Sequence, residues 1–136
     1  MTLAYDSSVS IPALVEDHRH HEIAATAVAE ADVTVAHTAA ETYSVLTRLP
    51  FPLRLDGAAA AALIDARLPG RWIALDAGAY ADALRRLAAH GVAGGMAYDG
   101  LIALTAANHD AGLVTLDARA SRTYRRLGVR FSLLGA

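Results

Sequence analysis

The chain has no cysteine and no lysine, and both absences limit its chemistry. Without cysteine it can form neither a disulfide framework nor a thiolate zinc site. Without lysine it has no phosphate-binding P-loop lysine and no amine for a Schiff base. All 12 basic residues are arginine, and the net charge is −2. The chain therefore lacks the overall positive charge typical of a strong nucleic-acid-binding protein, so any attraction to phosphate is expected to be local.

Long apolar runs are also missing. No segment approaches the roughly 18 uninterrupted apolar residues of a membrane span. The N-terminal MTLAYDSSV has no basic stretch followed by a long apolar run, so we expect no secretory signal, no membrane association and a cytoplasmic location. At 136 residues, with 54% hydrophobic and 19% charged residues, the chain is expected to form a single domain over residues 1–136.

The hydrophobic pattern predicts strands that alternate with helices. Strands are expected at residues 2–5, 33–36, 72–75, 113–116 and 129–133. Helices are expected at residues 8–15 with Ser7 or Ser8 as the cap, 18–31, 38–48, 57–66 capped by Asp56, 77–90 capped by Asp76, and 98–109. The alternation favours an α/β fold with a mainly parallel sheet covered on both faces. Such sheets bind ligands outside the carboxyl ends of their strands.

Four carboxylates fall at that edge of the expected sheet. Asp6 directly follows the first strand, and Asp117 follows the strand at 113–116. Glu41 lies one turn into the helix after the second strand, and Asp99 begins the helix that leads into 113–116. Clustered carboxylates repel one another and raise each other's pKa values, and divalent cations relieve that repulsion. Mg²⁺ accepts carboxylate oxygens, water and phosphate, so the pattern favours metal-assisted cleavage of a phosphodiester by an activated water.

Each acid also has a purely structural interpretation. Asp6 could cap the first helix, and Asp99 could favour the positive end of its own helix. Glu41 could be an ordinary first-turn glutamate, and Asp117 could be a turn residue. The occurrence of all four acids at one sheet edge favours a shared site over four separate structural roles.

Arginines cluster late in the sequence, and their spacing supports two interpretations equally. The cluster comprises Arg119, Arg122, Arg125, Arg126 and Arg130, preceded by Arg85 and Arg86 on an earlier helix. It could be a solvated helix face, or it could be a track for RNA phosphates.

Other polar and aromatic groups favour structural roles. The segment His18-x-His20-His21-Glu22 could indicate a transition-metal site, but a polar helix start with His21 packed or hydrogen-bonded is the favoured interpretation. The glycines of 91–95 lack the spacing of a nucleotide-binding loop and predict a mobile connection. Phe51 and Trp72 are expected in the core or an interface, not as platforms for stacked bases.

Phosphoaspartate enzymes are the nearest rival with a similar fold. The haloacid-dehalogenase type needs a second aspartate two residues after the first, and Ser8 stands there. That type and the receiver domains both use a lysine that this chain lacks. Both possibilities are therefore disfavoured.

Four stretches appear in the order seen in PIN domains, and the chain is similar to the VapC toxins of bacterial type II toxin–antitoxin pairs. The stretches are Asp6-Ser7-Ser8-Val9, Glu41-Thr42-Tyr43-Ser44-Val45-Leu46, Tyr98-Asp99-Gly100-Leu101-Ile102-Ala103 and Leu113-Val114-Thr115-Leu116-Asp117. The resemblance covers essentially the whole chain. It implies a three-layer α/β/α sandwich with a central mainly parallel sheet.

The resemblance also implies a function and its residues. The family consists of Mg²⁺- or Mn²⁺-dependent endoribonucleases, usually homodimers, which a VapB-type antitoxin silences by placing a C-terminal segment in the acidic site. Asp6 and Asp99 correspond to metal ligands, and Glu41 and Asp117 complete the site directly or through water. Ser8 and Thr115 correspond to positions that support the acids or the phosphate. Relatives often carry an arginine beside the last acid, and Arg119 is the candidate to replace it. The alternative is a catalytically silent PIN-like scaffold that only binds a protein partner.

Overall fold

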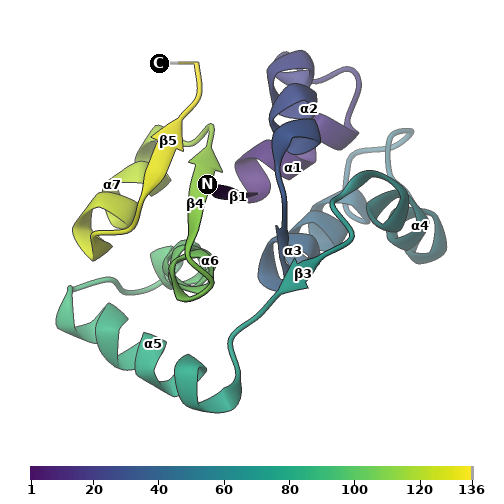
Figure 1. Ribbon diagram of the computed structural model, residues 1–136. Coiled ribbons are helices and arrows are strands. Elements are labelled where there is room, and N and C mark those ends of the chain that lie inside the picture. Colours follow the sequence, from purple (N-terminus) through teal and green to yellow (C-terminus); the bar gives the residue numbers. More distant parts are fainter. Residues whose placement is uncertain (136) are drawn as a thin grey trace.

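The computed structural model describes residues 1–135, and these form five strands and seven helices (Figure 1). The strands are β1 (Thr2–Tyr5), β2 (Thr34–Val35), β3 (Trp72–Ile73), β4 (Ala111–Thr115) and β5 (Phe131–Leu133). The helices are α1 (Ser7–Leu14), α2 (His21–Glu30), α3 (Ala36–Leu46), α4 (Gly57–Arg67), α5 (Ala77–Ala89), α6 (Met96–Asn108) and α7 (Ala118–Leu127). The predicted alternation of strands and helices is confirmed.

All strand pairs are parallel. One sheet has the order β1-β4-β5, with Tyr5 opposite Val114, and a second pairs β2 with β3. The two sheets meet where the backbone N–H groups of Asp32 and Val33 donate to the carbonyl of Leu3. Because the pairs are parallel, the carboxyl ends of β1 and β4 lie at the same edge, where the sequence analysis expected the acids.

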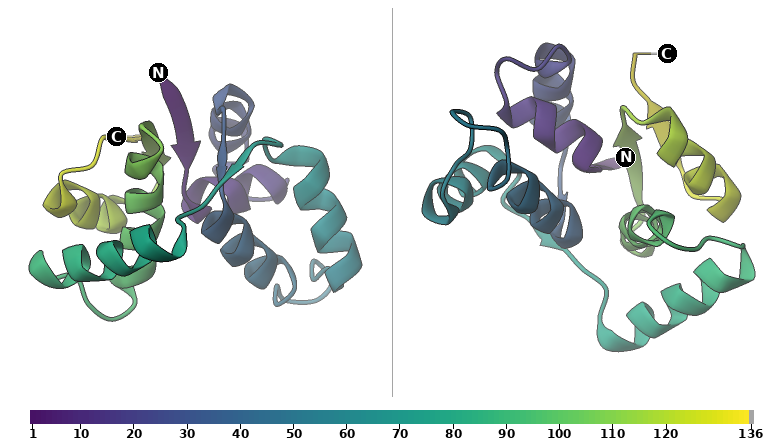
Figure 2. Two further views of the ribbon diagram at one scale, coloured as in Figure 1. Left: turned by 60° about the horizontal axis from the view of Figure 1, so that its bottom comes forward. Right: turned by 180° about the vertical axis from the view of Figure 1, so that it is seen from behind.

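Two apolar clusters on opposite faces of the sheet create the three layers. Neighbouring residues of a strand point to opposite faces. Accordingly, Ala4 and Leu113 pack with α6 and α7, whereas Tyr5 and Val114 pack with α1 to α4. Figure 2 shows these two helix groups on either side of the strands. The expected α/β/α arrangement is thus present.

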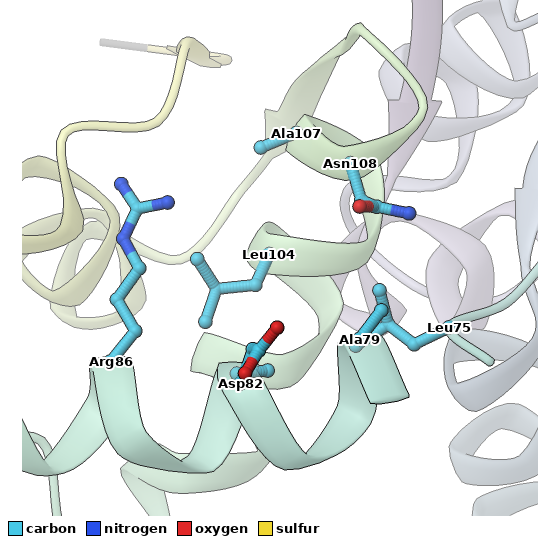
Figure 3. A pocket seen from close by; sticks show the side chains of 8 residues that line it. Leu75, Ala79, Asp82, Arg86, Leu104, Ala107 and Asn108 are labelled. Carbon is cyan, nitrogen blue, oxygen red and sulfur yellow. The ribbon is translucent and has the colours of Figure 1, made fainter. Parts of the chain in front are cut away.

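Helix α5 lies outside these layers and packs on α6 through its own apolar cluster, which includes Leu87 and Leu104. A pocket of about 230 Å³ remains between α5 and α6, lined among others by Asp82, Arg86 and Asn108 (Figure 3). None of the four candidate acids lines it. The pocket is therefore separate from the sheet edge that carries the acids.

Several predicted bounds were wrong, and the largest error concerns α7, to which the sequence analysis assigned no element. Asp117 caps its first turn, and Gly128 ends it with a φ of 72°, a left-handed conformation that favours glycine. Helix α2 begins at His21 instead of His18, because residues 15–20 form turns. Strands β2 and β3 pair over only two residues each. Strand β2 ends because α3 begins at Ala36. After β3, the carbonyl of Ala74 accepts a hydrogen bond from the ring of His109 and not from the neighbouring strand.

The caps and exposed aromatic residues also correct the predictions. The N-cap of α1 is Asp6, not Ser7 or Ser8, whereas Asp56 and Asp76 cap α4 and α5 as expected. Phe51 is 88% exposed and Trp72 is 47% exposed, so neither belongs to the core, and their expected place in an interface stays a prediction. Within residues 1–135, none of the helices has the length and apolar character that a membrane crossing requires.

Candidate active site

Asp6 is the buried centre of the site. It directly follows β1 and is only 2% exposed. Its Oδ1 accepts hydrogen bonds from the backbone N–H of Ser8 (3.1 Å) and from Ser8 Oγ (2.5 Å). Its Oδ2 accepts from Thr115 Oγ1 (2.6 Å) and from the hydroxyl of Tyr124 (2.5 Å). Burial raises the pKa of Asp6, and these hydrogen bonds act in the opposite direction because they stabilise the carboxylate.

Ser8 and Thr115 join α1 to the end of β4. Ser8 Oγ lies 3.2 Å from Thr115 Oγ1 and accepts a hydrogen bond from the backbone N–H of Leu116. Thr115 Oγ1 accepts a hydrogen bond from the N–H of Asp117 at 3.0 Å. The two hydroxyl groups therefore hold Asp6 and the start of the Asp117 turn in one arrangement, which is the supporting position expected for them.

Asp99 lies within electrostatic reach of the other three acids. It stands in the first turn of α6 and is half-buried. Its pKa is raised from 3.8 to about 6, first by burial and then by the negative charges of Asp6, Glu41 and Asp117. The positive charge of Arg119 opposes this increase. Charged residues from three other parts of the fold thus act on one carboxylate.

Glu41 is held by two neighbours that the sequence analysis did not select. Ser7 Oγ donates to Glu41 Oε1 at 3.0 Å, and His37 Nε2 lies 3.7 Å from Glu41 Oε2, one helical turn away. That distance is too long for a hydrogen bond, and the buried His37 Nε2 has no hydrogen-bond partner among the described residues. The imidazole of His37 stacks on the ring of Tyr98, with centroids 5.6 Å apart.

Asp117 has a structural role as well as its position at the site. Its Oδ1 accepts hydrogen bonds from the N–H groups of Arg119 (2.9 Å) and Ala120 (3.2 Å), which caps α7. A capping aspartate gains from the positive end of the helix dipole. Likewise, Asp6 caps α1. The cap interpretation of Asp6 is therefore correct and compatible with a place in the acidic cluster.

The donor set fits a hard divalent cation. Four carboxylates supply oxygen ligands of the kind that Mg²⁺ and Mn²⁺ accept, and the raised pKa of Asp99 records the repulsion that a cation would relieve. No three histidine, aspartate or glutamate side chains in residues 1–135 are close enough together to form a complete ligand group. Mg²⁺ needs no such group, because it usually binds through one or two carboxylates and retains water or substrate phosphate.

The histidine-rich segment has the structural role that the sequence favoured for it. The ring Nδ1 of His21 lies 2.9 Å from the carbonyl oxygen of Pro12 and ties α2 to α1. His18 Nδ1 accepts a hydrogen bond from the backbone N–H of His20. These imidazoles are therefore engaged with the backbone of their own region.

Tyr124 is the main residue that sequence reasoning missed. It is completely buried in α7, and its hydroxyl binds Asp6. Burial, followed by the charge of Asp6, raises the pKa of Tyr124 far above its ordinary value, so the hydroxyl stays protonated and remains a donor. The sequence offered no signal for this contact. For His37 the signal was present, since its spacing of four residues from Glu41 places both on one helix face.

Comparison with known proteins identifies the family. The model of the PIN domain family matches residues 4–126. Ribonuclease VapC40 of Mycobacterium tuberculosis is 41% identical over 132 residues, which cover 97% of this chain and 98% of the relative. The chain belongs to the VapC ribonucleases of the PIN domain family.

Solved VapC structures share the fold. The crystal structure of Mycobacterium tuberculosis VapC20, described as a sarcin-ricin loop cleaving toxin, superposes with a TM-score of 0.70 at 20% identity, covering 90% of this chain and 95% of that one. VapBC2 from Rickettsia felis, bound to a DNA fragment from its promoter, gives a TM-score of 0.66 at 15% identity, with 98% of both chains covered. The PIN fold that the sequence resemblance implied is therefore established.

Proposed function

We propose that this VapC-family chain is a Mg²⁺-dependent endoribonuclease, the toxin of a type II toxin–antitoxin pair, and that Asp6, Glu41, Asp99 and Asp117 form its active site. The carrying observation is the electrostatic influence of Asp6, Glu41 and Asp117 on Asp99. A phosphodiester cannot approach four carboxylates without a cation to offset their charge. The identity to Ribonuclease VapC40 supports RNA as the substrate.

Each acid has a role in this mechanism. Asp6 and Asp99 would be the principal ligands of the cation, and Glu41 and Asp117 would bind it directly or through water. Bound Mg²⁺, or Mn²⁺ in its place, supplies a Lewis acid and lowers the pKa of the attacking water. The protein contributes fixed ligand positions, since oriented groups need no reorganisation during the reaction.

The hydrogen bonds described above explain how the ligands are oriented. Ser8, Thr115 and Tyr124 occupy all four acceptor sites of Asp6, so its carboxylate cannot rotate. Asp6 would hold a cation in place of one of these hydroxyl contacts. Glu41 is fixed on one oxygen by Ser7, and Asp117 is fixed on Oδ1 by the start of α7. Among residues 1–135, the second oxygen of Asp117 accepts no hydrogen bond, and that of Glu41 has only His37 Nε2 nearby, at 3.7 Å.

The regulatory partner is part of the same proposal. The chain acts in the cytoplasm as a homodimer, and a VapB-type antitoxin inhibits it. The solved VapBC2 structure, which shares the fold, supports the assignment of a VapB-type antitoxin as the partner. Inhibition is explained if the antitoxin inserts a segment, often with a basic side chain, between the acids, because a cationic group relieves the same repulsion as the metal ion.

Cleavage of total RNA tests the nuclease function. The wild-type protein, Asp99→Asn and Asp82→Asn are purified free of antitoxin and incubated with Mg²⁺, with Mn²⁺ or with EDTA. Asp82 is the matched control, because it is a helix aspartate that is 79% exposed and pairs only with Arg85. We expect cation-dependent cleavage by the wild type and by Asp82→Asn, and none by Asp99→Asn.

Two results would overturn the proposal. Absence of cleavage with every cation, from folded protein free of antitoxin, would favour the non-catalytic scaffold. Undiminished cleavage by Asp99→Asn would place the active site elsewhere in the chain.

A further inference from the structure

The arginines of the late cluster separate into two groups in the structure. Four of them have partners outside residues 91–96: Arg130 pairs with Asp110 (3.0 Å), Arg85 pairs with Asp82 (2.7 Å), Arg86 donates to the carbonyl of Leu127, and Arg125 lies over the ring of Phe131. The others are Arg119, Arg122 and Arg126, which are exposed on α7, and of these Arg126 donates a 3.2 Å hydrogen bond to the carbonyl of Gly91. None of these three forms an ion pair with a carboxylate in residues 1–135.

These three arginines share one groove. It has a volume of about 270 Å³, and α7 forms one wall while Gly91, Val92, Ala93 and Met96 form the other. Positions three and four apart on a helix lie on the same face. At a rise of about 1.5 Å per residue, the seven steps from Arg119 to Arg126 span roughly 10 Å. The arginines therefore form a row along the groove, facing uncharged residues.

Arg119 connects this row to the acids. Its positive charge lowers the pKa of Asp99, and its backbone N–H binds the carboxylate of Asp117. It also lines a second, more open groove that contains Ser7, Ser8 and Asp117. The row of arginines thus begins at the candidate active site and leads away from it along α7.

We propose that the groove of Arg119, Arg122 and Arg126 binds the sugar–phosphate backbone of single-stranded RNA next to the cleaved bond. This inference rests on the proposed nuclease function. A polyanion that approaches four carboxylates on a protein with net charge −2 is repelled unless positive charge is supplied locally. Exposed guanidinium groups without carboxylate partners supply that charge and form bidentate hydrogen bonds to phosphate. An acidic protein segment would match the arginines but would gain nothing from their position beside the acids.

Salt-dependent RNA binding tests the proposal. A fluorescein-labelled, unstructured RNA of 12 nucleotides is titrated with protein in EDTA, which prevents cleavage, and the anisotropy is measured at several KCl concentrations. The variants are Arg122→Gln and Arg126→Gln. The control is Arg125→Gln, which removes the same charge from a residue of the same helix that lies over Phe131 and does not line the groove. Thermal unfolding verifies that each variant is folded.

We expect Arg122→Gln and Arg126→Gln each to weaken RNA binding severalfold, and to reduce the slope of log K against log[KCl] by about 0.7 for each lost phosphate contact. Arg125→Gln should keep the wild-type slope. Equal effects of all three substitutions, or none from Arg122→Gln and Arg126→Gln, would overturn the proposal. The proposal would also be overturned if Arg122→Gln and Arg126→Gln lost affinity for poly-glutamate but not for RNA. That result would assign the groove to an acidic protein segment.

The cleavage experiment keeps the two proposals distinguishable. If the wild type cleaves RNA and Asp99→Asn does not, while Arg122→Gln binds like Arg125→Gln, the groove assignment is wrong and the nuclease function stands. If the wild type neither cleaves nor binds RNA, the nuclease function itself fails and the groove assignment fails with it.

Discussion

The hydroxyl of Tyr124 donates a 2.5 Å hydrogen bond to Oδ2 of Asp6, although 118 residues separate them in the sequence. Both side chains are almost completely inaccessible to water. The bond connects α7 to the end of β1 across the sheet. It therefore makes the position of the candidate metal ligand depend on the packing of the last helix.

Replacing Tyr124 by phenylalanine removes this donor and keeps the ring. We expect the free energy of unfolding to fall by about 1.5–3 kcal/mol, because a hydrogen bond to a charged group is lost in a buried site. The affinity for Mg²⁺ should also change, since Asp6 loses one of the groups that fix it. Urea unfolding and a Mg²⁺ titration measure the two effects. Tyr43→Phe, at a 42% exposed position, is the control. Identical stability of the two variants would contradict the role given to Tyr124.

The pKa of Asp99 predicts how stability without metal depends on pH. Its value of about 6 in the folded protein lies above its ordinary value of 3.8, so the folded state binds the proton more tightly. Stability is therefore greatest below the ordinary value and falls as the pH rises through about 6. Asp99→Asn removes the free-energy cost of keeping a charged carboxylate at this position in the folded protein. Because Asp99 is only half-buried, we expect the variant to gain about 1 kcal/mol over the wild type at pH 8, less than the full linkage value.

Chemical unfolding in EDTA at pH 4, 6 and 8 measures this difference. Asp82→Asn should follow the wild-type pH dependence, since Asp82 is an exposed partner of Arg85. Parallel curves for the wild type and Asp99→Asn would show that the repulsion between the acids is absent.

Thr115→Val tests the hydroxyl groups around Asp6. The substitution keeps the shape of the side chain and removes an oxygen that contacts Asp6, Ser8 and the N–H of Asp117. We expect a loss of about 2 kcal/mol in the free energy of unfolding, because buried polar groups remain unpaired. Thr105→Val is the matched control. Thr105 is also buried, but its hydroxyl only bonds back to the carbonyl of Leu101 in the same helix. If Thr115→Val and Thr105→Val lost equal free energies of unfolding in denaturant titrations, the stabilising role of the hydroxyl groups around Asp6 would be refuted.

The neighbouring Arg85 and Arg86 should differ in importance. Arg86 extends from α5 along the pocket of Figure 3 and donates a 2.8 Å hydrogen bond to the carbonyl of Leu127, at the end of α7. A cation at that end also interacts favourably with the helix dipole. We expect Arg86→Ala to lower the free energy of unfolding by about 1–2 kcal/mol. Arg85→Ala removes only an exposed ion pair, so its cost should be below about 0.5 kcal/mol. Thermal and urea unfolding of both variants would reveal the ranking, and the opposite ranking would contradict it.

The sequence predicted the parts of the site that follow from strand direction. Asp6 and Asp117 follow parallel strands, so their common edge could be deduced without a structure. The resemblance supplied the supporting hydroxyls of Ser8 and Thr115, and the structure places both on Asp6. The catalytic and metal-binding roles of these residues stay predictions.

Tertiary contacts across the sheet could not be deduced in the same way. Tyr124 lies in an arginine-rich segment whose apolar face gave no clear assignment, and its partner Asp6 is 118 residues away, directly after β1. Charge patterning alone also could not separate the arginines of α7. Arg125 and Arg126 are adjacent in sequence, yet one lies over Phe131 and the other lines the groove. The orientation of α7 about its own axis decides which arginine faces the groove, and that orientation is set by how the helix packs on the core.

The pairing of β1 with β4 has a consequence for the synthesis of this protein. Thr2 lies opposite Ala111, so the first strand has no neighbour in its sheet until most of the chain has been translated. Two of the four groups that hold Asp6 come later still, at Thr115 and Tyr124. A nascent chain on the ribosome therefore carries an incomplete candidate site almost to its end. Termination before Tyr124 would leave a fragment in which Asp6 lacks part of the hydrogen-bond network that holds it.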